Sequence, residues 1–274
     1  MQTTIEEIIS SYNPSTIEET KAIIRGIVQS IVLIGLSRSN FFKIASFYGG
    51  TALRIFYNLN RYSEDLDFTL NEVDDNFSIT PYISKIQEVA LSYGLNLEIS
   101  SKIKTANTYQ TFINLRINNK MVSTLHKDEN IKVKLEIDSH PTIGFKTENK
   151  WLDMLEFAPV VVLDEPSLFA GKIHAILCRN YKNTVKGRDY YDFLFYVKNR
   201  IKPNMNYLKN KLVESSKIKE DIDFNIDVLK AMLKQRFEIT NFDQVKKDAM
   251  RFVFKNEDLS YYCKELFMQM VDKL

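Results

Sequence analysis

The feature that most constrains the fold of this chain is a pair of glycines between a strand-like segment and a helix-like segment. Residues 44–48 form a short apolar stretch typical of a strand, and helical spacing runs from Thr51 to about Tyr57. Gly49 and Gly50 stand between the two. Glycine lets backbone N–H groups approach a ligand closely, and the N-terminus of the following helix carries partial positive charge. The segment therefore predicts a strand–turn–helix unit that suits a phosphate group.

Two acidic residues follow the glycines. Asp65 and Asp67 flank Leu66 at the start of a predicted strand over residues 66–70. Positions i and i+2 of a strand point to the same face, so both carboxylates share a face and Leu66 points into the core. Carboxylates held close together repel each other unless a cation lies between them, and oxygen ligands favour Mg²⁺ or Mn²⁺. A phosphate site beside such a metal site is what phosphoryl or nucleotidyl transfer requires.

Each signal also has a plain structural interpretation. Glycine pairs are common in ordinary turns. Asp65 and Asp67 alone would suit an exposed, solvated strand edge equally well. The two signals in this order favour the catalytic interpretation.

The chain changes character near residue 160. Strand-type alternation occurs only before this point, and only helical patterns follow Pro166. We therefore expect an α+β fold, with an α/β domain over residues 1–160 and an all-helical domain over residues 161–274. The predicted strands cover residues 44–48, 66–70, 95–105, 109–117 and 131–138, and the predicted helices cover residues 15–38, 51–57, 79–93, 166–179, 188–198, 205–214, 221–237, 243–254 and 256–274.

Composition narrows the protein class. The net charge of +2 gives no general preference for nucleic acid, so any basic surface must be local. Cys178 and Cys263 form no CxxC pair, which argues against structural zinc and favours free thiols over a single disulfide. The N-terminus lacks a signal-peptide pattern, and the apolar runs are shorter than the roughly 20 residues that span a bilayer. We expect a cytoplasmic protein without a membrane partner.

Four segments resemble motifs of one family. Residues 49–53 (Gly-Gly-Thr-Ala-Leu) followed by residues 63–68 (Ser-Glu-Asp-Leu-Asp-Phe) resemble the first motif of the AbiEii toxins. These are nucleotidyltransferase-like toxins of abortive-infection, type IV toxin–antitoxin systems, and the mycobacterial MenT toxins are their relatives. The resemblance continues in residues 132–137, 168–177 and 187–193, in the order of the family. Residues 200–274 carry no such motif.

The resemblance implies a fold and a set of site residues. It implies a nucleotidyltransferase core like that of DNA polymerase β, with a mixed sheet and a helical C-terminal domain that completes the active-site cleft. The residues implied to bind the NTP are Gly49, Gly50, Thr51, Ser63, Lys172 and Arg188. The implied catalytic residues are Asp65, Asp67, Glu136, Lys172 and Asp189, of which Asp65, Asp67 and Glu136 would bind the metal.

The third carboxylate has two candidates. Alternation in residues 131–138 places Glu136 and Asp138 on one face of the strand. Glu136 falls where the family has an acid, and we favour it. Many polymerase-β-like enzymes carry Asp at this place, so Asp138 stays open.

Positive charge accumulates in residues 172–200, with seven Lys or Arg against two Asp. Such a segment suits a groove for triphosphate or an RNA backbone, and a solvated helix–loop–helix face explains it equally well. Tyr190 and Tyr191 lie within it and cannot both face a groove, so at least one is expected in the core. Tyr261 and Tyr262, near the end of the chain, are also expected in the core.

The leading hypothesis is a metal-dependent nucleotidyltransferase that moves NMP from NTP to an acceptor and releases pyrophosphate. By resemblance the acceptor is the 3′ end of a tRNA, and a cognate antitoxin neutralises the protein. The same donor site would also serve a protein acceptor or phosphorylation. A third hypothesis is a nucleotide- or RNA-binding module without turnover, against which the intact acids Asp65, Asp67 and Asp189 argue.

Overall fold

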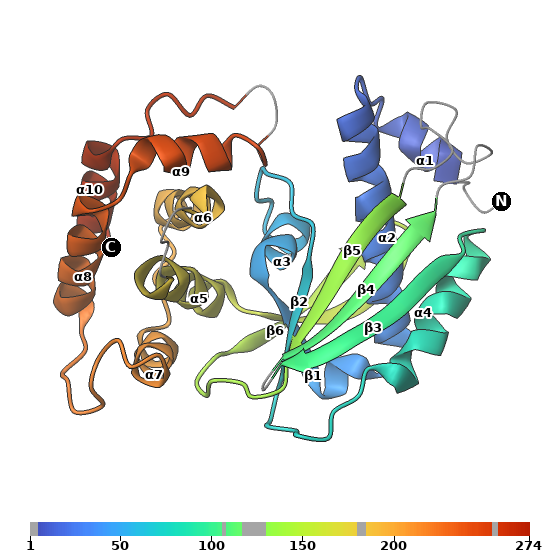
Figure 1. Cartoon of the computed structure of the whole chain (residues 1–274), viewed down its shortest axis with the longest axis horizontal. Helices are drawn as coiled ribbons and strands as arrows, with labels where there is room; N and C mark the ends of the chain where they lie inside the picture. Colours follow the sequence, from blue (N-terminus) through green and yellow to red (C-terminus); the bar gives the residue numbers. More distant parts are fainter. Residues whose placement is uncertain (1–4, 106–107, 117–129, 180–184, 254–256) are drawn as a thin grey trace. The chain divides into compact units, whose positions relative to one another are not determined.

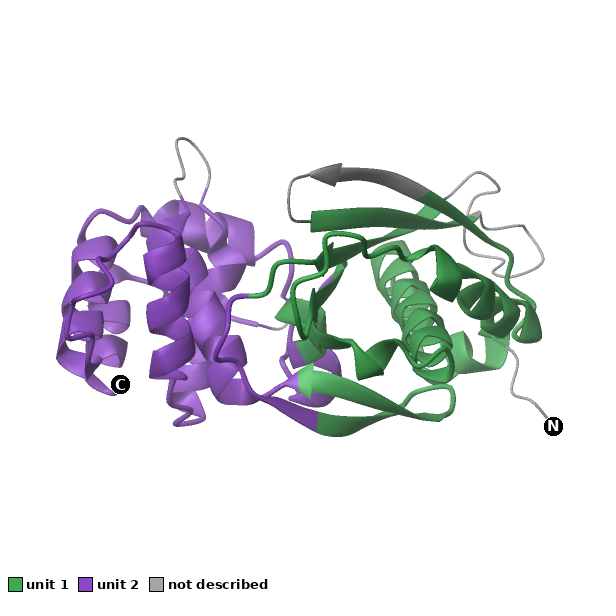
Figure 2. Ribbon diagram, turned by 90° about the horizontal axis from the view of Figure 1, so that it is seen from below, with its two compact units in different colours: residues 1–52, 64–141, 149–162 green, residues 53–63, 142–148, 163–274 purple. Residues whose placement is uncertain are grey.

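The computed structural model describes residues 5–105, 108–116, 130–179, 185–253 and 257–274 (Figure 1). Contacts divide the chain into two compact units. Unit 1 comprises residues 1–52, 64–141 and 149–162, and unit 2 comprises residues 53–63, 142–148 and 163–274 (Figure 2). The helical unit thus takes in residues 53–63 and 142–148, which the sequence assigns to the N-terminal domain.

A mixed seven-stranded sheet is the centre of unit 1, with the order β3-β4-β5-β2-β1-β7-β6. β1 runs antiparallel to β2 and parallel to β7, and β2 runs parallel to β5. The sheet therefore confirms the expected α+β fold class with a mixed sheet. The strands are β1 (Ala45–Tyr48), β2 (Leu66–Leu70), β3 (Leu97–Thr105), β4 (Thr108–Arg116), β5 (Asn130–Asp138), β6 (Thr147–Asp153) and β7 (Phe157–Leu163).

Two helices, α2 (Ile17–Arg38) and α4 (Thr80–Ser92), cover one face of this sheet (Figure 1). The side chain of Thr16 accepts the backbone N–H of Glu19 and caps α2. A Cβ on Gly35 would lie 2.6 Å from the Cα of Ile86, so the glycine allows α2 and α4 to approach closely. The shorter helices of this half are α1 (Ile5–Ser11), η1 (Phe41–Lys43) and α3 (Gly49–Phe56).

The length of α2 corrects one expectation from the sequence. This helix has 22 residues and a most apolar window of mean hydropathy 1.4, so its length and composition would allow a bilayer span. However, 72% of that window is buried inside the protein. A helix that is apolar all round and buried is a core helix, and α2 is the central helix of unit 1.

β5, the strand that carries Glu136 and Asp138, has the expected alternation. Val133, Leu135 and Ile137 of β5 are fully buried, and the residues between them are partly or fully exposed. β6 and β7 were not predicted from the sequence, and in β7 Pro159 interrupts the strand pattern. Proline lacks the N–H but keeps its carbonyl, which here accepts the Ser37 hydroxyl at 2.7 Å.

Unit 2 contains six helices among the described residues, and this confirms the predicted helical character. α8 begins later than predicted because the Asn225 side chain accepts the N–H groups of Asp227 and Val228 and so starts the helix there. The helices are α5 (Glu165–Cys178), α6 (Gly187–Lys198), α7 (Met205–Glu214), α8 (Ile226–Glu238), α9 (Phe242–Ala249) and α10 (Lys264–Asp272).

Aromatic side chains form the core of unit 2. Phe193, Phe237 and Phe267 are fully buried around α6, with ring centroids 5.5–6.3 Å apart. Tyr190 is fully buried, as one of the two adjacent tyrosines was expected to be. The prediction for Tyr261 is wrong, because its side chain is 51% exposed.

Candidate active site

The turn between β1 and α3 lies against the second predicted acid. Gly49 has φ +84°, a conformation that favours glycine. A Cβ added at Gly49 would collide with Oδ2 of Asp67 and would lie 3.1 Å from the Cβ of Asp67. β1 pairs with β2 so that Tyr48 lies beside Asp67. Glycine at this position therefore lets the Asp67 carboxylate lie directly over the start of α3.

The first predicted acid is anchored through the backbone around it. The buried Thr51 hydroxyl donates to the carbonyl oxygen of Asp65. Gln29, fully buried in α2, donates to the carbonyl oxygen of Glu64 at 3.0 Å. These bonds fix the segment that enters β2.

A row of polar residues crosses the sheet at Asp67. Register pairs Asp67 of β2 with Glu136 of β5, and Glu136 with Gln110 of β4. Paired residues point to the same face of a sheet, which here is opposite to the face that packs on α2. Glu136 Oε1 accepts Gln110 Nε2 at 2.9 Å and lies 2.7 Å from Lys134 Nζ.

The same register separates the two candidates for the third carboxylate. Asp138 pairs with Thr69, two residues beyond Asp67 along β2. Its Oδ1 accepts the backbone N–H of His140 at 3.0 Å, which uses the carboxylate to close the turn after β5. Glu136, in contrast, lies directly beside Asp67. This register favours Glu136 as the residue that shares a site with Asp67.

The described residues contain no group of three or more His, Cys, Asp or Glu side chains placed to hold a metal ion. The predicted three-carboxylate site is therefore not assembled in this arrangement, in which Lys134 contacts Glu136. Mg²⁺ in phosphoryl-transfer sites commonly takes one or two carboxylates, and substrate phosphates and water supply the other oxygens. Asp67 in β2 and Asp65 in the segment directly before it are two carboxylates, which matches that smaller donor set.

The other predicted acid, Asp189, belongs to a charge network inside unit 2. Asp189 is only 2% exposed. Lys172 Nζ lies 3.1 Å from its Oδ1, and the Arg179 guanidinium contacts its Oδ2. α5 and α6 thus bring Lys172 and Asp189, two of the predicted site residues, into contact.

Sequence reasoning missed the centre of this network. Asp192 is fully buried one helical turn after Asp189, and Lys172 Nζ lies 2.7 Å from its Oδ2. Arg61, only 2% exposed, donates to both oxygens of Asp192 at 2.7 Å each. The i, i+3 spacing of the two aspartates was the available signal, since such residues share a helix face. Nothing in the local sequence marks Arg61.

Burial and charge act in opposite directions on this pair. Burial raises the pKa of Asp192, but the positive charges and hydrogen bonds of Arg61 and Lys172 outweigh it and hold the pKa below its usual value. Burial lowers the pKa of Arg61, and the negative charge of Asp192 outweighs that and raises it. Both groups are therefore charged at neutral pH, and Lys172 is held between two carboxylates.

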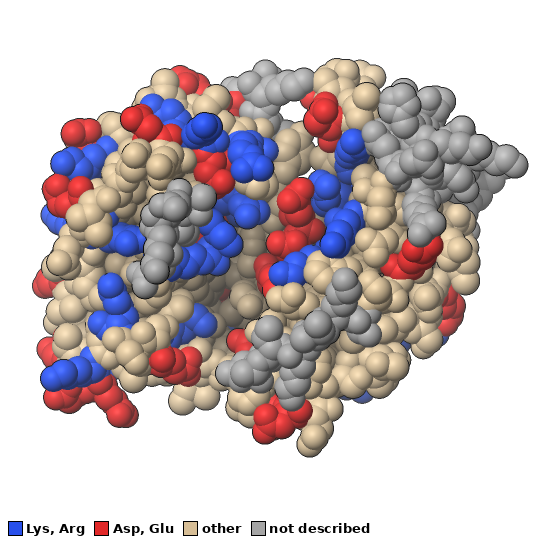
Figure 3. Space-filling model, in the orientation of Figure 1, with Lys and Arg blue, Asp and Glu red and all other residues tan. Residues whose placement is uncertain are grey.

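Further cations surround this network. Burial, together with the charges of Arg179, Arg188 and Lys172, lowers the pKa of Lys186, although Asp189 acts in the opposite direction. Arg188 stacks its guanidinium over the Phe252 ring at 4.0 Å. Figure 3 shows Lys and Arg side chains gathered on one face of unit 2. Lys182, part of the predicted basic segment, lies outside the described residues.

The predicted site residues thus form two groups. Unit 1 contains Gly49, Gly50, Thr51, Asp65, Asp67 and Glu136 around the β1–α3 turn and the neighbouring strands. Unit 2 contains Ser63, Lys172, Arg188 and Asp189. Ser63 is half-buried in the segment that leads to β2.

Comparison with solved structures shows the fold. JHP933 from Helicobacter pylori is 18% identical with a TM-score of 0.57, over 92% of this chain and 90% of that one. MenT4, a nucleotidyltransferase toxin from Mycobacterium tuberculosis, is 15% identical with a TM-score of 0.54, over 97% of this chain and 98% of that one. No curated protein sequence matches the chain. The chain therefore shares its fold with MenT4 over nearly the whole length of both.

The sequence itself identifies the family. Residues 31–258 match the family described as nucleotidyl transferase AbiEii toxin, type IV TA system. This range contains all four motifs predicted from the sequence and most of both units. The match confirms the resemblance and, with it, the nucleotidyltransferase class. The chain belongs to the AbiEii family of nucleotidyltransferase toxins of type IV toxin–antitoxin systems.

Proposed function

We propose that this toxin transfers NMP from a Mg²⁺-bound NTP to an RNA acceptor, the 3′ end of a tRNA, and releases pyrophosphate. The observation that carries the proposal is the Asp67 carboxylate, held over the Gly49 turn at the start of α3 and beside Glu136. A helix N-terminus favours phosphate, and carboxylates favour the cation that accompanies a triphosphate.

Unit 1 positions the donor nucleotide in this proposal. The backbone N–H groups at Gly49, Gly50 and Thr51 would bind phosphate oxygens, while Ser63 donates from the segment before β2. Asp65 and Asp67 would hold Mg²⁺, with Glu136 as the third acid once it exchanges Lys134 for the metal. The ion supplies neutralisation of the triphosphate and of the leaving pyrophosphate.

Unit 2 supplies fixed positive charge in the proposal. Lys172 would bind the phosphates of the NTP, and Arg188 would assist it. Asp189 and Asp192 hold the Lys172 ammonium from two sides, so its position is fixed before the substrate arrives. Asp189 acts here as a positioning residue for Lys172, a role that its burial and its two cationic partners support.

The biological setting also remains a proposal. Transfer to tRNA would block translation, and a cognate antitoxin, either a protein or a modifying kinase, would neutralise the activity. A cytoplasmic location fits both roles. Cys178 and Cys263 are free thiols, as a reducing compartment favours.

A labelling experiment tests the acceptor and the chemistry together. Purified protein is incubated with Mg²⁺, total tRNA and each NTP carrying ³²P at the α or the γ position. We expect α label on tRNA from wild type and none from Asp65→Asn. Retained γ label would indicate phosphorylation, and α label on a protein band would indicate a protein acceptor. NTP binding without any label transfer would favour a binding module over a transferase.

A further inference from the structure

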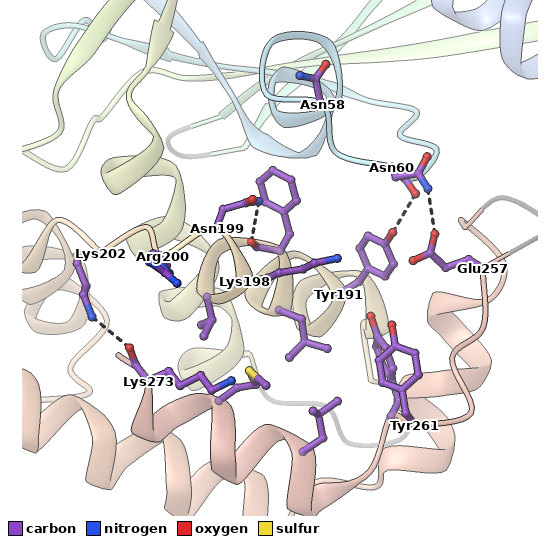
Figure 4. A pocket seen from close by; sticks show the side chains of 16 residues that line it. Asn58, Asn60, Tyr191, Lys198, Asn199, Arg200, Lys202, Glu257, Tyr261 and Lys273 are labelled. Carbon is purple, nitrogen blue, oxygen red and sulfur yellow. Dashed lines mark hydrogen bonds between the residues drawn. The ribbon is translucent and has the colours of Figure 1, made fainter.

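A cavity in unit 2 has a lining that contains none of the charged residues of the Lys172 network, although the lining residues Asn60 and Tyr191 are next to Arg61 and Asp192 in the chain. Its volume is about 940 Å³, at the upper end of the range for small-molecule sites. Residues of α6, the segment after it and α10 form most of its wall, and Asn58 and Asn60 complete it (Figure 4). None of its lining residues is among those predicted for the transferase site.

Cations dominate the charged groups of this cavity. Its lining contains four Lys or Arg side chains and one carboxylate, Glu257, all within the described residues. Lys198 and Arg200 come from the end of α6, and Lys273 comes from the end of α10 (Figure 4). The C-terminal ends of helices carry partial negative charge, which stabilises cations at these positions without using a carboxylate.

The backbone at Arg200 supports a role for its side chain. Arg200 has φ +59°, a left-handed conformation that glycine or asparagine adopts more easily. Its N–H closes the turn after α6 on the carbonyl of Val197 at 3.1 Å. A guanidinium is therefore kept at the cavity wall at a position where the backbone favours a smaller residue, and such outliers often accompany function.

Aromatic rings form another part of the lining. Tyr261 is 51% exposed, whereas Tyr262 beside it is 2% exposed. Tyr191 donates its hydroxyl to the carbonyl of Asn60 at 2.9 Å, and the Asn60 side chain donates to Glu257 at 3.0 Å (Figure 4). These bonds fix the wall, so the exposed Tyr261 ring is presented from a rigid base.

We propose that this cavity binds a nucleotide unit, with phosphate on Lys198, Arg200 and Lys273 and the base stacked on Tyr261. Cations bind phosphate groups, and an exposed aromatic ring stacks on any base. The nucleotide unit belongs either to a single-stranded RNA or to a free nucleotide. This site is separate from the proposed transfer site and does not depend on turnover.

Fluorescence anisotropy tests the proposal without NTP and with EDTA present, so that transfer activity does not enter. The probes are a six-nucleotide single-stranded RNA with a fluorescein label and a fluorescent ATP analogue. We expect wild type to bind at least one probe. Tyr261→Ala should weaken binding by about ten-fold, within the range of one base stack. The double variant Lys198→Gln, Arg200→Gln should also reduce the slope of log affinity against log salt concentration by about two, which corresponds to two lost phosphate contacts.

Matched controls separate the cavity from general effects of charge and folding. Lys219→Gln removes an exposed lysine outside the lining, and Tyr12→Ala removes a tyrosine that is 56% exposed in unit 1. Both should bind as wild type does, and all variants should keep their melting temperature. If unlabelled RNA displaces the bound probe and unlabelled nucleotide does not, the ligand is an RNA strand. The opposite result indicates that the ligand is a free nucleotide.

Two results would overturn this inference. One is a wild-type protein that binds neither probe. The other is unchanged affinity and salt dependence in the Tyr261 and Lys198/Arg200 variants. If the wild-type protein binds RNA but shows no ³²P label transfer, that result counts against the proposed transferase function alone and leaves this inference intact.

Discussion

The acids of the two units have opposite environments, although both groups were predicted as catalytic. In unit 2, Asp192 is fully buried and receives two bonds from Arg61 and one contact from Lys172. In unit 1, Asp67 and Glu136 are partly exposed on an open sheet face, and Lys134 is the cation that contacts Glu136. Acidic and basic side chains lie side by side on this surface (Figure 3).

This difference separates two uses of carboxylates. A buried carboxylate needs its own cations, and the network in unit 2 supplies them from the protein. Because the carboxylates of unit 1 are partly exposed, they can lie close together without substrate. They gain a cation when the metal and the triphosphate bind. The comparison predicts that substitutions in unit 1 affect activity more than stability, and that substitutions in unit 2 affect stability first.

Asp67→Asn should have the largest effect on activity. The amide keeps the shape of the side chain but loses the charge that the metal requires, so we expect label transfer to fall by about 10³-fold or more. The melting temperature should change far less than in a variant of the buried Arg61–Asp192 pair, because Asp67 is partly exposed. Transfer of α label to tRNA and thermal unfolding measure the two effects. A large fall in stability would contradict the division between the units.

Arg61→Met should have the largest effect on stability. It leaves Asp192 buried and in contact with Lys172, and breaking a buried ion pair costs about 3–5 kcal/mol. Urea unfolding measures this change. Adding Asp192→Leu to Arg61→Met should recover part of the lost free energy, because the isolated charge is removed. A cost below about 1 kcal/mol would mean that the network is not a stability element.

The sequence reveals the open site better than the buried network. The order of the Gly49–Gly50 turn, Asp65 and Asp67 is local in the chain, and strand parity alone places both acids on one face. The pairing of Arg61 with Asp192 joins positions 131 residues apart, and only tertiary packing creates it. For the same reason, the exposure of Tyr261 was not predictable, since its neighbour Tyr262 has the same residue type and is buried.

The third carboxylate offers an intermediate effect within unit 1. Glu136→Gln should reduce transfer by about 10²-fold, because Glu136 lies beside Asp67 in the sheet register. Asp138→Asn is the matched control, since Asp138 lies on the same strand face but pairs with Thr69. We expect it to retain most activity. A larger loss in Asp138→Asn than in Glu136→Gln would reverse the assignment of the third acid.

The Gly49 turn can be tested with a matched glycine. Gly49→Ala and Gly94→Ala both place a side chain at positive φ, which costs about 1–2 kcal/mol in each case. A Cβ at Gly94 meets nothing within 4 Å, whereas a Cβ at Gly49 collides with the Asp67 carboxylate. Both variants should therefore lose stability, Gly49→Ala more than Gly94→Ala because of this collision, and only Gly49→Ala should lose transfer, by about ten-fold or more. Equal activity in the two would show that the Asp67 position is not set by Gly49.

The smallest effect concerns the positive field of unit 2. Burial, then the charges of Lys211 and Arg179, lowers the pKa of His174 from 6.5 to about 4. Between these pH values the unfolded chain binds the proton and the folded chain does not, so stability falls as pH falls through this window. The His174 contribution is complete above pH 6.5 and is lost by about pH 4.

Urea unfolding across this window, in wild type and His174→Gln, measures the contribution. The wild-type slope should exceed the variant slope by at most about one proton. Glutamine keeps a polar group near the Ser215 hydroxyl, which His174 Nε2 contacts at 2.5 Å. Arg179→Gln should raise the pKa of His174, because it removes one of the charges that depress it. Identical slopes in wild type and His174→Gln would mean that folding does not lower the pKa of His174, and that neither its burial nor the charges of Lys211 and Arg179 affect stability in this window.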